Sequence, residues 1–404
     1  MVLCLRFRWF QLKEVLLADK NIPPPQGDRP DFPGKVRLAL PENIYAVAGM
    51  ECNIYFDNVV VAINPANYVF DASCPAQRKE RDDPGKGMAL SERWTWTPKP
   101  EEAGDYSIQI EVVDESNAVV ARGRSLVHVV PADAGSGKAI SLLCIGDSIT
   151  HALNSYTGHL LELCKSPGNP RLRLIGGNQP DPARPENCHE GYGGWSAERF
   201  VTQGSAIPGD HTRRGSPFLY PDAKGSPRLD FARYCREFSE GKAPDFATIF
   251  LGGNDVFFDT DQTIDATVEQ VLGFYDKLIE MVLDFDGKTQ VGILPQIPSP
   301  VEQNVFGISY GCMKTRWQHK RNQRWLAEGI LARYQGREKE RIWVVPVDIN
   351  LDCAHGYPTV SGPWNVHSDQ AGSRQSNAHP VTSGQRQVAD ALFAWLKAVL
   401  ASRR

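Results

Sequence analysis

The sequence of 404 residues lacks the patterns that build metal sites and membrane spans. Its nine cysteines include no C-x-x-C pair and no cluster with histidine at the spacing of zinc sites, which favours isolated and mostly buried thiols. Apolar runs are short, and none approaches the roughly 20 residues that a membrane-spanning helix requires. We therefore expect neither a bound metal nor a transmembrane segment.

An excess of charge of one sign is also absent. The chain carries 44 Lys and Arg residues against 48 Asp and Glu residues, and the basic residues are scattered along it. Nucleic acid is therefore excluded as an expected partner. The start of the chain is basic and aromatic but lacks the apolar stretch and cleavage site of a signal peptide. As written it has the pattern of an intracellular protein, whereas a secreted or periplasmic protein with a truncated start would look the same.

The length exceeds what one hydrophobic core usually supports, so we expect two domains after a lead-in. The lead-in covers residues 1–35 and is extended, because prolines and glycines are dense near its end. Residues 36–133 predict a small all-β sandwich, since short β-rich runs alternate there with turn residues. These runs are 53–56, 59–63, 94–97, 106–113 and 125–130. A stretch of small residues at 132–138 is typical of a linker.

One segment of the first domain favours an immunoglobulin-like sandwich. Residues 98–106 read PKPEEAGDY and precede alternating Ile108, Ile110 and Val112. This pattern resembles the tyrosine corner of immunoglobulin-like domains, with Tyr106 as the tyrosine. A surface tyrosine at the end of any hairpin would give the same pattern. The domain is expected either to bind carbohydrate or to pack beside the second domain and shape its active-site rim.

Residues 138–404 predict an α/β domain. Apolar strand-like runs occur at 140–145, 172–175, 246–251, 291–294 and 342–347. Between or after them, apolar residues recur every three or four positions, as in amphipathic helices. These stripes are Leu153, Tyr156, Leu160 and Cys164; Ile264, Val268, Val271, Tyr275, Leu278 and Val282; and Val388, Leu392, Trp395 and Val399. The alternation indicates a parallel sheet covered on both faces. The last helix is expected to begin with a capping box at 382–385.

A serine follows the first strand of this domain. Residues 142–150 read LLCIGDSIT, so an apolar strand ends in a Gly-Asp-Ser turn and then enters a helix. Ser148 is therefore expected at the carboxyl edge of the sheet, where ligands bind in open α/β folds. The following helix N-terminus offers backbone N–H groups to a developing anion. This position indicates a nucleophile.

A serine hydroxyl needs a base that removes its proton. Of the nine histidines, His379 is the best placed, because it lies in SNAHP (376–380), directly before the C-terminal helix. There the chain should return to the same edge of the sheet. His379 is therefore the predicted general base.

Acyl transfer also requires hydrogen-bond donors for the tetrahedral oxyanion. The glycine-rich segment EGYGGWS (190–196) offers the N–H of Gly194. The segment LGGND (251–255) ends the third strand and offers the side-chain amide of Asn254. A flexible loop and an Asn-Asp turn, respectively, would explain each segment alone. Both nevertheless follow strands in the order that an active site would require.

Together these four segments resemble the SGNH (GDSL-type) hydrolase superfamily over residues 139–400. The matching blocks are GDSIT with Ser148, GYGGWS with Gly194, LGGND with Asn254 and NAHP with His379. The resemblance implies a flavodoxin-like three-layer α/β/α fold. It also implies that Ser148 is the nucleophile and His379 the base, with oxyanion donors at Ser148 N–H, Gly194 N–H and the Asn254 amide. It implies no metal or organic cofactor.

The sequence departs from that family at the third member of the triad. The family usually places an aspartate three residues before the histidine, where this chain has Ser376. A Ser-His dyad oriented by Ser376, Asn377 or a backbone carbonyl is the favoured interpretation. A distant carboxylate, Asp348 or Asp352, is the alternative. His355, in the sequence DCAH, is a rival base that lacks the following proline and helix.

The fold alone does not choose the ester. Aromatic residues are expected beside the oxyanion donors or on long loops, mixed with polar side chains such as Arg316, Gln318, His319, Lys320 and Asn365. These aromatic residues are Trp195, Phe257, Phe258, Tyr310, Trp317 and Trp364. The mixture favours a polar substrate, and the β-sandwich ahead of the SGNH domain resembles bacterial carbohydrate esterases. We therefore expect an esterase that removes acetyl groups from a small-molecule, oligosaccharide or polysaccharide ester. The alternatives are a general short-chain esterase or thioesterase and a catalytically silent glycan-binding protein.

Overall fold

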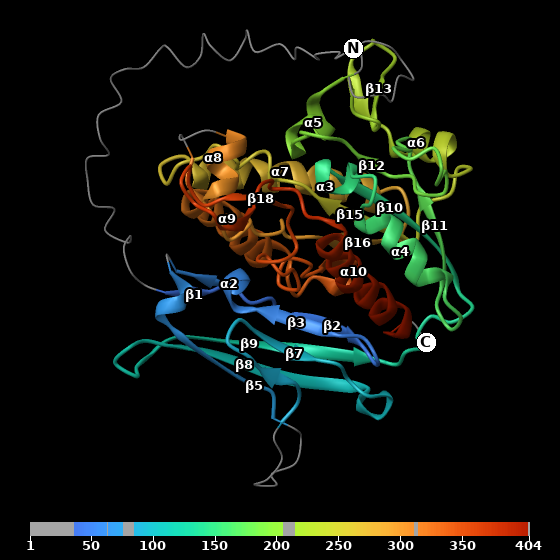
Figure 1. Cartoon of the computed structure of the whole chain (residues 1–404). Helices are drawn as coiled ribbons and strands as arrows, with labels where there is room; N and C mark the ends of the chain where they lie inside the picture. Colours follow the sequence, from blue (N-terminus) through green and yellow to red (C-terminus); the bar gives the residue numbers. More distant parts are fainter. Residues whose placement is uncertain (1–35, 63, 76–84, 205–214, 311–313, 403–404) are drawn as a thin grey trace. The chain divides into compact units, whose positions relative to one another are not determined.

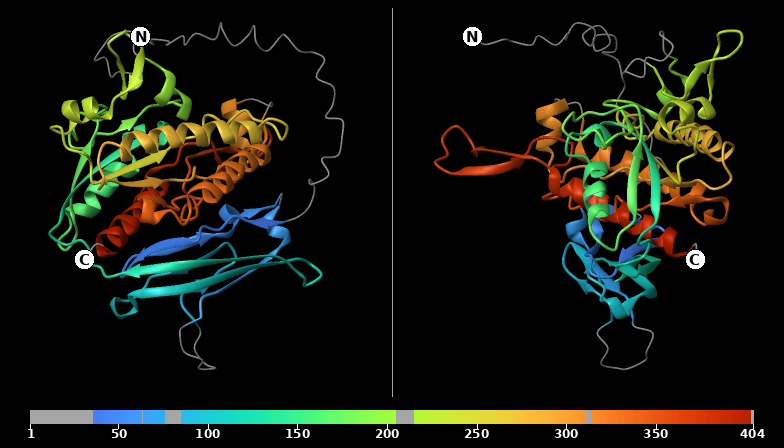
Figure 2. Two further views of the ribbon diagram at one scale, coloured as in Figure 1. Left: turned by 180° about the vertical axis from the view of Figure 1, so that it is seen from behind. Right: turned by 90° about the vertical axis from the view of Figure 1, so that its right-hand side faces the viewer.

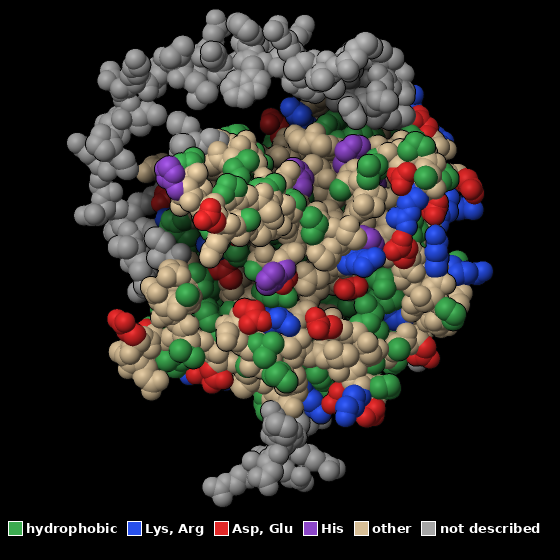
Figure 3. Space-filling model, in the orientation of Figure 1, with side chains coloured by type: hydrophobic (Ala, Val, Ile, Leu, Met, Phe, Trp, Pro, Cys, Tyr) green, Lys and Arg blue, Asp and Glu red, His purple; other side chains and the backbone are tan. Residues whose placement is uncertain are grey.

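The computed structural model of the chain describes residues 36–62, 64–75, 85–204, 215–310 and 314–402. Residues 36–404 form one compact unit, whereas the predicted lead-in lies outside the described residues. Within the described part, no helix is long and apolar enough to cross a membrane. On the face drawn in Figure 3, acidic and basic side chains are interspersed.

A parallel sheet forms the centre of residues 139–404 (Figure 1). Its strands are β10 (Ala139–Gly146), β11 (Arg171–Ile175), β12 (Glu190–Gly191), β15 (Phe246–Phe250), β16 (Gln290–Ile293) and β17 (Ile342–Val344). Five of them follow the order β11-β10-β15-β16-β17, and β12 pairs with the end of β10. Counted along the chain this is the order 2-1-3-4-5 of flavodoxin-like folds. The predicted α/β domain with a parallel sheet is confirmed.

Helices cover both faces of this sheet (Figure 2). They are α3 (Ser148–His151), α4 (Tyr156–Lys165), α5 (Ala197–Thr202), α6 (Phe231–Phe238), α7 (Ile264–Leu283), α8 (Asn304–Tyr310), α9 (Arg316–Tyr334) and α10 (Thr382–Ser402). Alternate residues of β10 enter two separate cores. Leu142 packs in the core with α4 and α10, whereas Leu143 packs in the core with α7 and α9. The sheet is therefore the middle of three layers.

Two short hairpins leave this layered body. They are β13 (Leu219–Pro221) with β14 (Pro227–Leu229), and β18 (Thr359–Pro363) with β19 (Ala371–Gln375). The second hairpin projects away from the sheet in the right-hand view of Figure 2. The end of β19 lies four residues before His379, so the hairpin and the base share one stretch of chain.

Several sequence predictions at the element level are wrong. Residues 316–320 were expected on a long loop, but they begin helix α9. Polar residues 319–324 of this helix are nevertheless buried, and Lys320 and Arg324 among them form ion pairs. The periodicity of apolar residues was therefore no guide to this helix. Leu153 is 60% exposed and lies outside α4. The Gln385 side chain does not close a capping box, since it bonds to Tyr156 and Ile149 instead.

Residues 37–130 form three small sheets. The strands are β1 (Arg37–Leu38), β2 (Asn43–Val47), β3 (Cys52–Tyr55), β4 (Val60–Val61), β5 (Val69–Ser73), β6 (Met88–Ala89), β7 (Arg93–Trp96), β8 (Gly104–Val113) and β9 (Val119–Val130). The sheets have the orders β2-β9-β8-β5, β3-β7-β6 and β1-β4. The strand expected at 59–63 is present in part as β4, and helix α2 (Phe56–Val59) comes directly before it. Tyr106 packs edge-on against Trp96 at 5.0 Å, and the immunoglobulin-like assignment stays a prediction.

These sheets are joined to the α/β layers by buried polar contacts. The Asn58 side chain donates to the carbonyl oxygens of Asp348 (2.9 Å) and Leu351 (2.7 Å). Arg324 of α9 donates to the Asn58 carbonyl and pairs with the Asp348 carboxylate at 2.9 Å. Asp57 pairs with Lys320 at 2.5 Å. The polar residues of α9 therefore fix the position of the N-terminal sheets.

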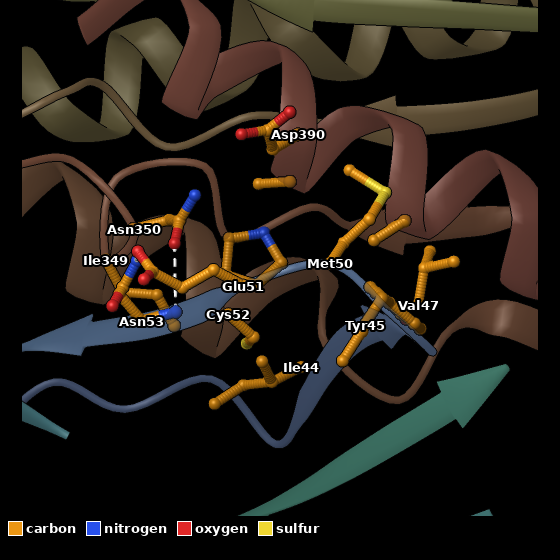
Figure 4. Close-up of a pocket in the computed structure, with 14 residues that line it drawn as sticks. Ile44, Tyr45, Val47, Met50, Glu51, Cys52, Asn53, Ile349, Asn350 and Asp390 are labelled. Carbon is orange, nitrogen blue, oxygen red and sulfur yellow. Dashed lines mark hydrogen bonds between the residues drawn. The ribbon is translucent and has the colours of Figure 1, made fainter. Parts of the chain in front are cut away.

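A second contact region lies between β2, β3 and α10 (Figure 4). The backbone N–H of Asn53 donates to Asn350 Oδ1 at 3.0 Å. Tyr45, Met50 and Asp390 line a small cavity there. Burial, together with the nearby Glu51 carboxylate, raises the pKa of Asp390 to about 6. Because α10 begins three residues after His379, these contacts hold the helix that follows the base.

Candidate active site

The predicted nucleophile lies where the strand order of the sheet reverses. Strands β10 and β15 are neighbours, and Gly146 pairs with Phe250 at their carboxyl ends. Their next strands run outward in opposite directions, which makes this edge the topological switch point where α/β folds bind ligands. Ser148 follows β10 and Asn254 follows β15. The two predicted site residues therefore meet at one edge.

The turn that presents Ser148 is specified by its neighbours. A Cβ atom at Gly146 would lie 2.0 Å from Thr150 Oγ1, so a larger residue does not fit there. Asp147 is the N-cap of α3, and its Oδ1 accepts from the backbone N–H of Ile149 at 2.9 Å. Burial raises the pKa of Asp147 to about 7. Its carboxyl group is a structural support of the turn.

Ser148 and His379 are in hydrogen-bond contact. The distance from His379 Nε2 to Ser148 Oγ is 2.8 Å. On the other side of the ring, His379 Nδ1 lies 2.9 Å from Asn377 Oδ1. Since an amide oxygen only accepts, Nδ1 carries the proton and Nε2 is left to accept from the serine hydroxyl. This is the arrangement that a serine and its base require.

Asn377 is held by a second bond to the same loop. Its Oδ1 also accepts from the backbone N–H of His379, at 3.0 Å. The loop ends at α10, where Gln385 Oε1 accepts from Tyr156 N at 2.9 Å. Gln385 Nε2 donates to the carbonyl of Ile149 at 3.2 Å. Gln385 thus ties the helix after the base to the helix that begins with the nucleophile.

The other candidates for orienting or replacing the base lie elsewhere. Ser376 Oγ donates to the carbonyl of Pro358 at 3.3 Å. Asp348 pairs with Arg324. Asp352 Oδ2 lies 2.8 Å from His355 Nδ1. Asn377 is therefore the side chain in contact with His379 Nδ1, as the dyad interpretation allowed.

Asn254 and Gly194 lie on segments that touch. Asn254 Nδ2 donates to the carbonyl of Trp195 at 2.9 Å. An amide NH₂ group has two hydrogens, so one remains for a ligand. Gly194 has a φ of +75°, a conformation that favours glycine, and it precedes Trp195 directly. Asn254 lines the cavity at Ser148, whereas Gly194 is not among the lining residues.

A carboxylate that the sequence analysis missed anchors the same pair of segments. Asp255 Oδ2 accepts from the backbone N–H of Ala197, the first residue of α5, at 3.1 Å. Burial raises the pKa of Asp255 to about 6. The sequence contained a signal for this role. Asp255 directly follows the predicted Asn254 in LGGND, so both side chains lie after the end of β15.

The cavity beside Ser148 is small, at about 70 Å³. Its lining residues include Asn254, Phe257, Gln296, Ile297, Pro298, Ser299, Tyr310, His319, Gln323, Tyr357 and His379. Buried cavities need roughly 10–15 Å³ of such volume for one water, so this space takes a group of a few heavy atoms. A long acyl chain does not fit within it.

The predicted aromatic residues divide into three environments. Phe257 and Tyr310 line the cavity, and Phe258 beside them is 82% exposed. Trp195 is buried and packs against Phe200 at 4.9 Å, so it belongs to the core. Three of the aromatic residues were expected on long loops. Trp317 instead lies in α9 and Tyr310 ends α8, whereas Trp364 is exposed near the β18–β19 hairpin.

Polar residues expected around a substrate are partly used elsewhere. Arg316 and Lys320 both pair with Asp57 of the N-terminal region, at 2.9 Å and 2.5 Å. Gln318 donates to Asp261 at 3.0 Å. His319 does line the cavity. Among the described residues, no group of His, Cys, Asp and Glu is arranged to hold a metal ion.

The acid limb of the pH–rate profile should depend on residue 377. Burial lowers the pKa of His379, so its imidazole stays neutral and able to accept a proton below the usual range of histidine. The change Asn377→Asp places a carboxylate against Nδ1 and favours the imidazolium. We expect the acid limb of kcat/KM to move to higher pH by about one unit or more.

Ser376→Ala is the matched control for this change, because Ser376 contacts Pro358 and not the imidazole. Its pH–rate profile should coincide with that of the wild type. An acid limb at the same pH in wild type and Asn377→Asp would contradict the position of Asn377 against the ring.

Comparison with known proteins gives likenesses of structure. Scans of protein-family models and of curated proteins gave no match to this sequence. A Clostridium thermocellum family 3 carbohydrate esterase is similar over 66% of this chain and 99% of its own, at 15% identity and a TM-score of 0.41. A family 3 carbohydrate esterase from Talaromyces cellulolyticus is similar over 65% and 99%, at 14% identity and a TM-score of 0.37.

A carbohydrate acetylesterase from Sinorhizobium meliloti is similar over 64% of this chain and 99% of its own, at 14% identity and a TM-score of 0.35. These identities and TM-scores are low. The interpretation of the site therefore depends on the contacts among Ser148, His379, Asn377 and Asn254.

Proposed function

We propose that the chain is a serine esterase that hydrolyses short acyl esters through an acyl-enzyme on Ser148. The observation that carries this proposal is the chain of contacts from Asn377 through His379 to Ser148, located at the switch point of the sheet. Hydrogen bonds of this kind activate a hydroxyl that is otherwise a weak nucleophile.

In the proposed reaction, His379 Nε2 takes the proton of Ser148 as Oγ attacks the ester carbonyl carbon. The carbonyl oxygen becomes an oxyanion, which the backbone N–H groups of Ser148 and Gly194 and the free amide hydrogen of Asn254 stabilise. The C–O bond then breaks, and His379 gives its proton to the departing alcohol. Water attacks the acyl-enzyme in the same way, with His379 as base, and releases the acid and Ser148.

The dimensions of the cavity support an acetyl or similarly short acyl group. Its polar lining supports an ester of a hydroxylated alcohol, and an O-acetylated carbohydrate has both properties. The exposed Trp364, with Arg374 at 4.5 Å over its ring, offers a flat surface on the hairpin before His379. Such surfaces are available for stacking against sugar rings.

The test compares three substrate classes with the purified chain. These are p-nitrophenyl esters of increasing acyl length, acetylated xylooligosaccharides and a short acyl-thioester, with kcat/KM as the readout. The proposal expects a steep decrease beyond short acyl groups and the highest value for the acetylated sugar. A preference for the thioester or for long acyl chains would contradict the carbohydrate acetylesterase assignment.

A further inference from the structure

Three cavity-lining side chains carry a buried polar atom that has no hydrogen-bond partner among the described residues. The atoms are Ser299 Oγ, His319 Nδ1 and Gln323 Oε1. The residues are only 4%, 5% and 6% exposed. A buried polar atom without a partner costs about 1–3 kcal/mol. Three such atoms around one cavity indicate partners that a ligand supplies.

Asn322, which lies next to Gln323 in α9, differs from these residues because its side-chain amide is hydrogen-bonded. Asn322 donates to the carbonyls of Val256 (2.9 Å) and Asp259 (2.8 Å), so both of its amide hydrogens are used. His319 and Gln323 are four residues apart, which places them on the same face of the helix. The unpartnered atoms therefore lie on one side of α9 while the adjacent amide is satisfied.

The orientation of these side chains is fixed by the contacts of their other atoms. Gln323 Nε2 donates to the carbonyl of Ile297 at 2.9 Å, which holds the amide plane. The His319 ring lies between Phe257 and Phe306, at centroid distances of 5.0 Å and 5.2 Å. These contacts pre-organise the side chains, so little conformational entropy is lost when a ligand binds.

The side chains around this wall favour an uncharged ligand group. Burial, together with the nearby Lys314 ammonium, lowers the pKa of His319 to about 3, so the imidazole is neutral. Lys314 Nζ itself lies 3.8 Å from the centroid of Phe257. The wall thus combines a neutral ring nitrogen, an amide oxygen and a hydroxyl. Hydroxyl groups, which both donate and accept, match this set.

We propose that Ser299, His319 and Gln323 form a subsite that binds hydroxyl groups of the alcohol part of the substrate. This inference rests on the proposed esterase function. An acetyl group contains no hydrogen-bond donor, so the donor that Gln323 Oε1 requires comes from the alcohol. The subsite therefore selects esters of polyhydroxylated alcohols over esters of hydrocarbon alcohols of the same size.

The experiment compares a mono-O-acetylated methyl xyloside with cyclohexyl acetate, whose ring has no hydroxyl groups. The readout is the ratio of their kcat/KM values in wild type, Ser299→Ala and His319→Phe. Loss of one hydrogen bond from such a site corresponds to a decrease of about tenfold in this ratio. The control is Gln335→Leu. The Gln335 side chain also has a buried oxygen without a partner in the part of the chain that the structure describes, but it does not line the cavity.

A ratio that falls about tenfold in Ser299→Ala and His319→Phe and is unchanged in Gln335→Leu is the expected result. Equal losses on both esters, or a wild type without preference for the xyloside, would overturn the subsite. Ser148→Ala separates this failure from failure of the esterase proposal. If Ser148→Ala leaves hydrolysis of both esters intact, the esterase proposal itself is wrong.

Discussion

Replacement of Ser148 by alanine is expected to lower kcat for p-nitrophenyl acetate by on the order of 10⁴–10⁶. The change removes the oxygen atom that forms the acyl-enzyme. This oxygen, Ser148 Oγ, is the hydroxyl that lies 2.8 Å from His379 Nε2. Replacement of His379 by alanine is expected to have an effect of the same order, because the two side chains act as a unit. Initial rates at saturating substrate measure both.

The matched control for His379→Ala is His355→Ala. His355 is the rival base in the sequence, but its ring contacts Asp352 and does not line the cavity. Its removal should leave kcat within a factor of about two, as for surface positions generally. Circular dichroism would show that the variants keep their fold. Activity that survives in His379→Ala but is lost in His355→Ala would reverse the assignment of the base.

Asn254→Ala is expected to lower kcat by on the order of 10²–10³, the usual effect of one lost oxyanion donor. The free hydrogen of its amide is positioned by the bond from Nδ2 to the Trp195 carbonyl at 2.9 Å. Because the oxyanion exists only in the transition state, KM should change much less than kcat. Steady-state kinetics with a short acyl ester separate the two parameters.

Asn43→Ala provides a control for loss of a hydrogen-bonded asparagine outside the cavity. Asn43 Nδ2 donates to Glu338 Oε1 at 3.0 Å, between β2 and the short 3₁₀ helix Glu338–Glu340 that follows α9. That variant should retain the kcat of the wild type. An Asn254→Ala enzyme with unchanged kcat, or with a raised KM alone, would remove Asn254 from the oxyanion site.

Residues at strand ends explain why the candidate site could be predicted from sequence. Ser148 follows β10 and Asn254 follows β15, and parallel strands bring their carboxyl ends to one edge. His379 was identified through the helix that follows it, which is α10. These are local patterns, since each depends on a strand or helix that lies within a few residues of the functional side chain.

Long-range pairing explains what the sequence did not reveal. Helix α9 is polar along its length, and its burial depends on partners such as Asp57, about 260 residues away in the chain. The roles of Ser299, His319 and Gln323 depend on a wall formed by two separate segments. In contrast, the contact between Asn377 and His379 is local, and it was one of several alternatives that only three-dimensional geometry could separate.

The contacts of α9 also connect the N-terminal sheets to the active site. One side of the helix holds Arg324, which bonds to Asn58 and Asp348. Another part of it carries His319 and Gln323 in the wall of the cavity. We infer that the N-terminal sheets support the position of this wall, which is one of the two roles that the sequence predicted for the first domain.

Covalent labelling of Ser148 tests the central claim most directly. A fluorophosphonate reacts with an activated serine, and mass spectrometry of the digested protein locates the adduct. We expect one adduct on the peptide that contains Ser148 in the wild type, and no adduct there in Ser148→Ala or His379→Ala. An enzyme that hydrolyses acetyl esters while Ser148 stays unlabelled, or while another serine carries the adduct, would contradict the account.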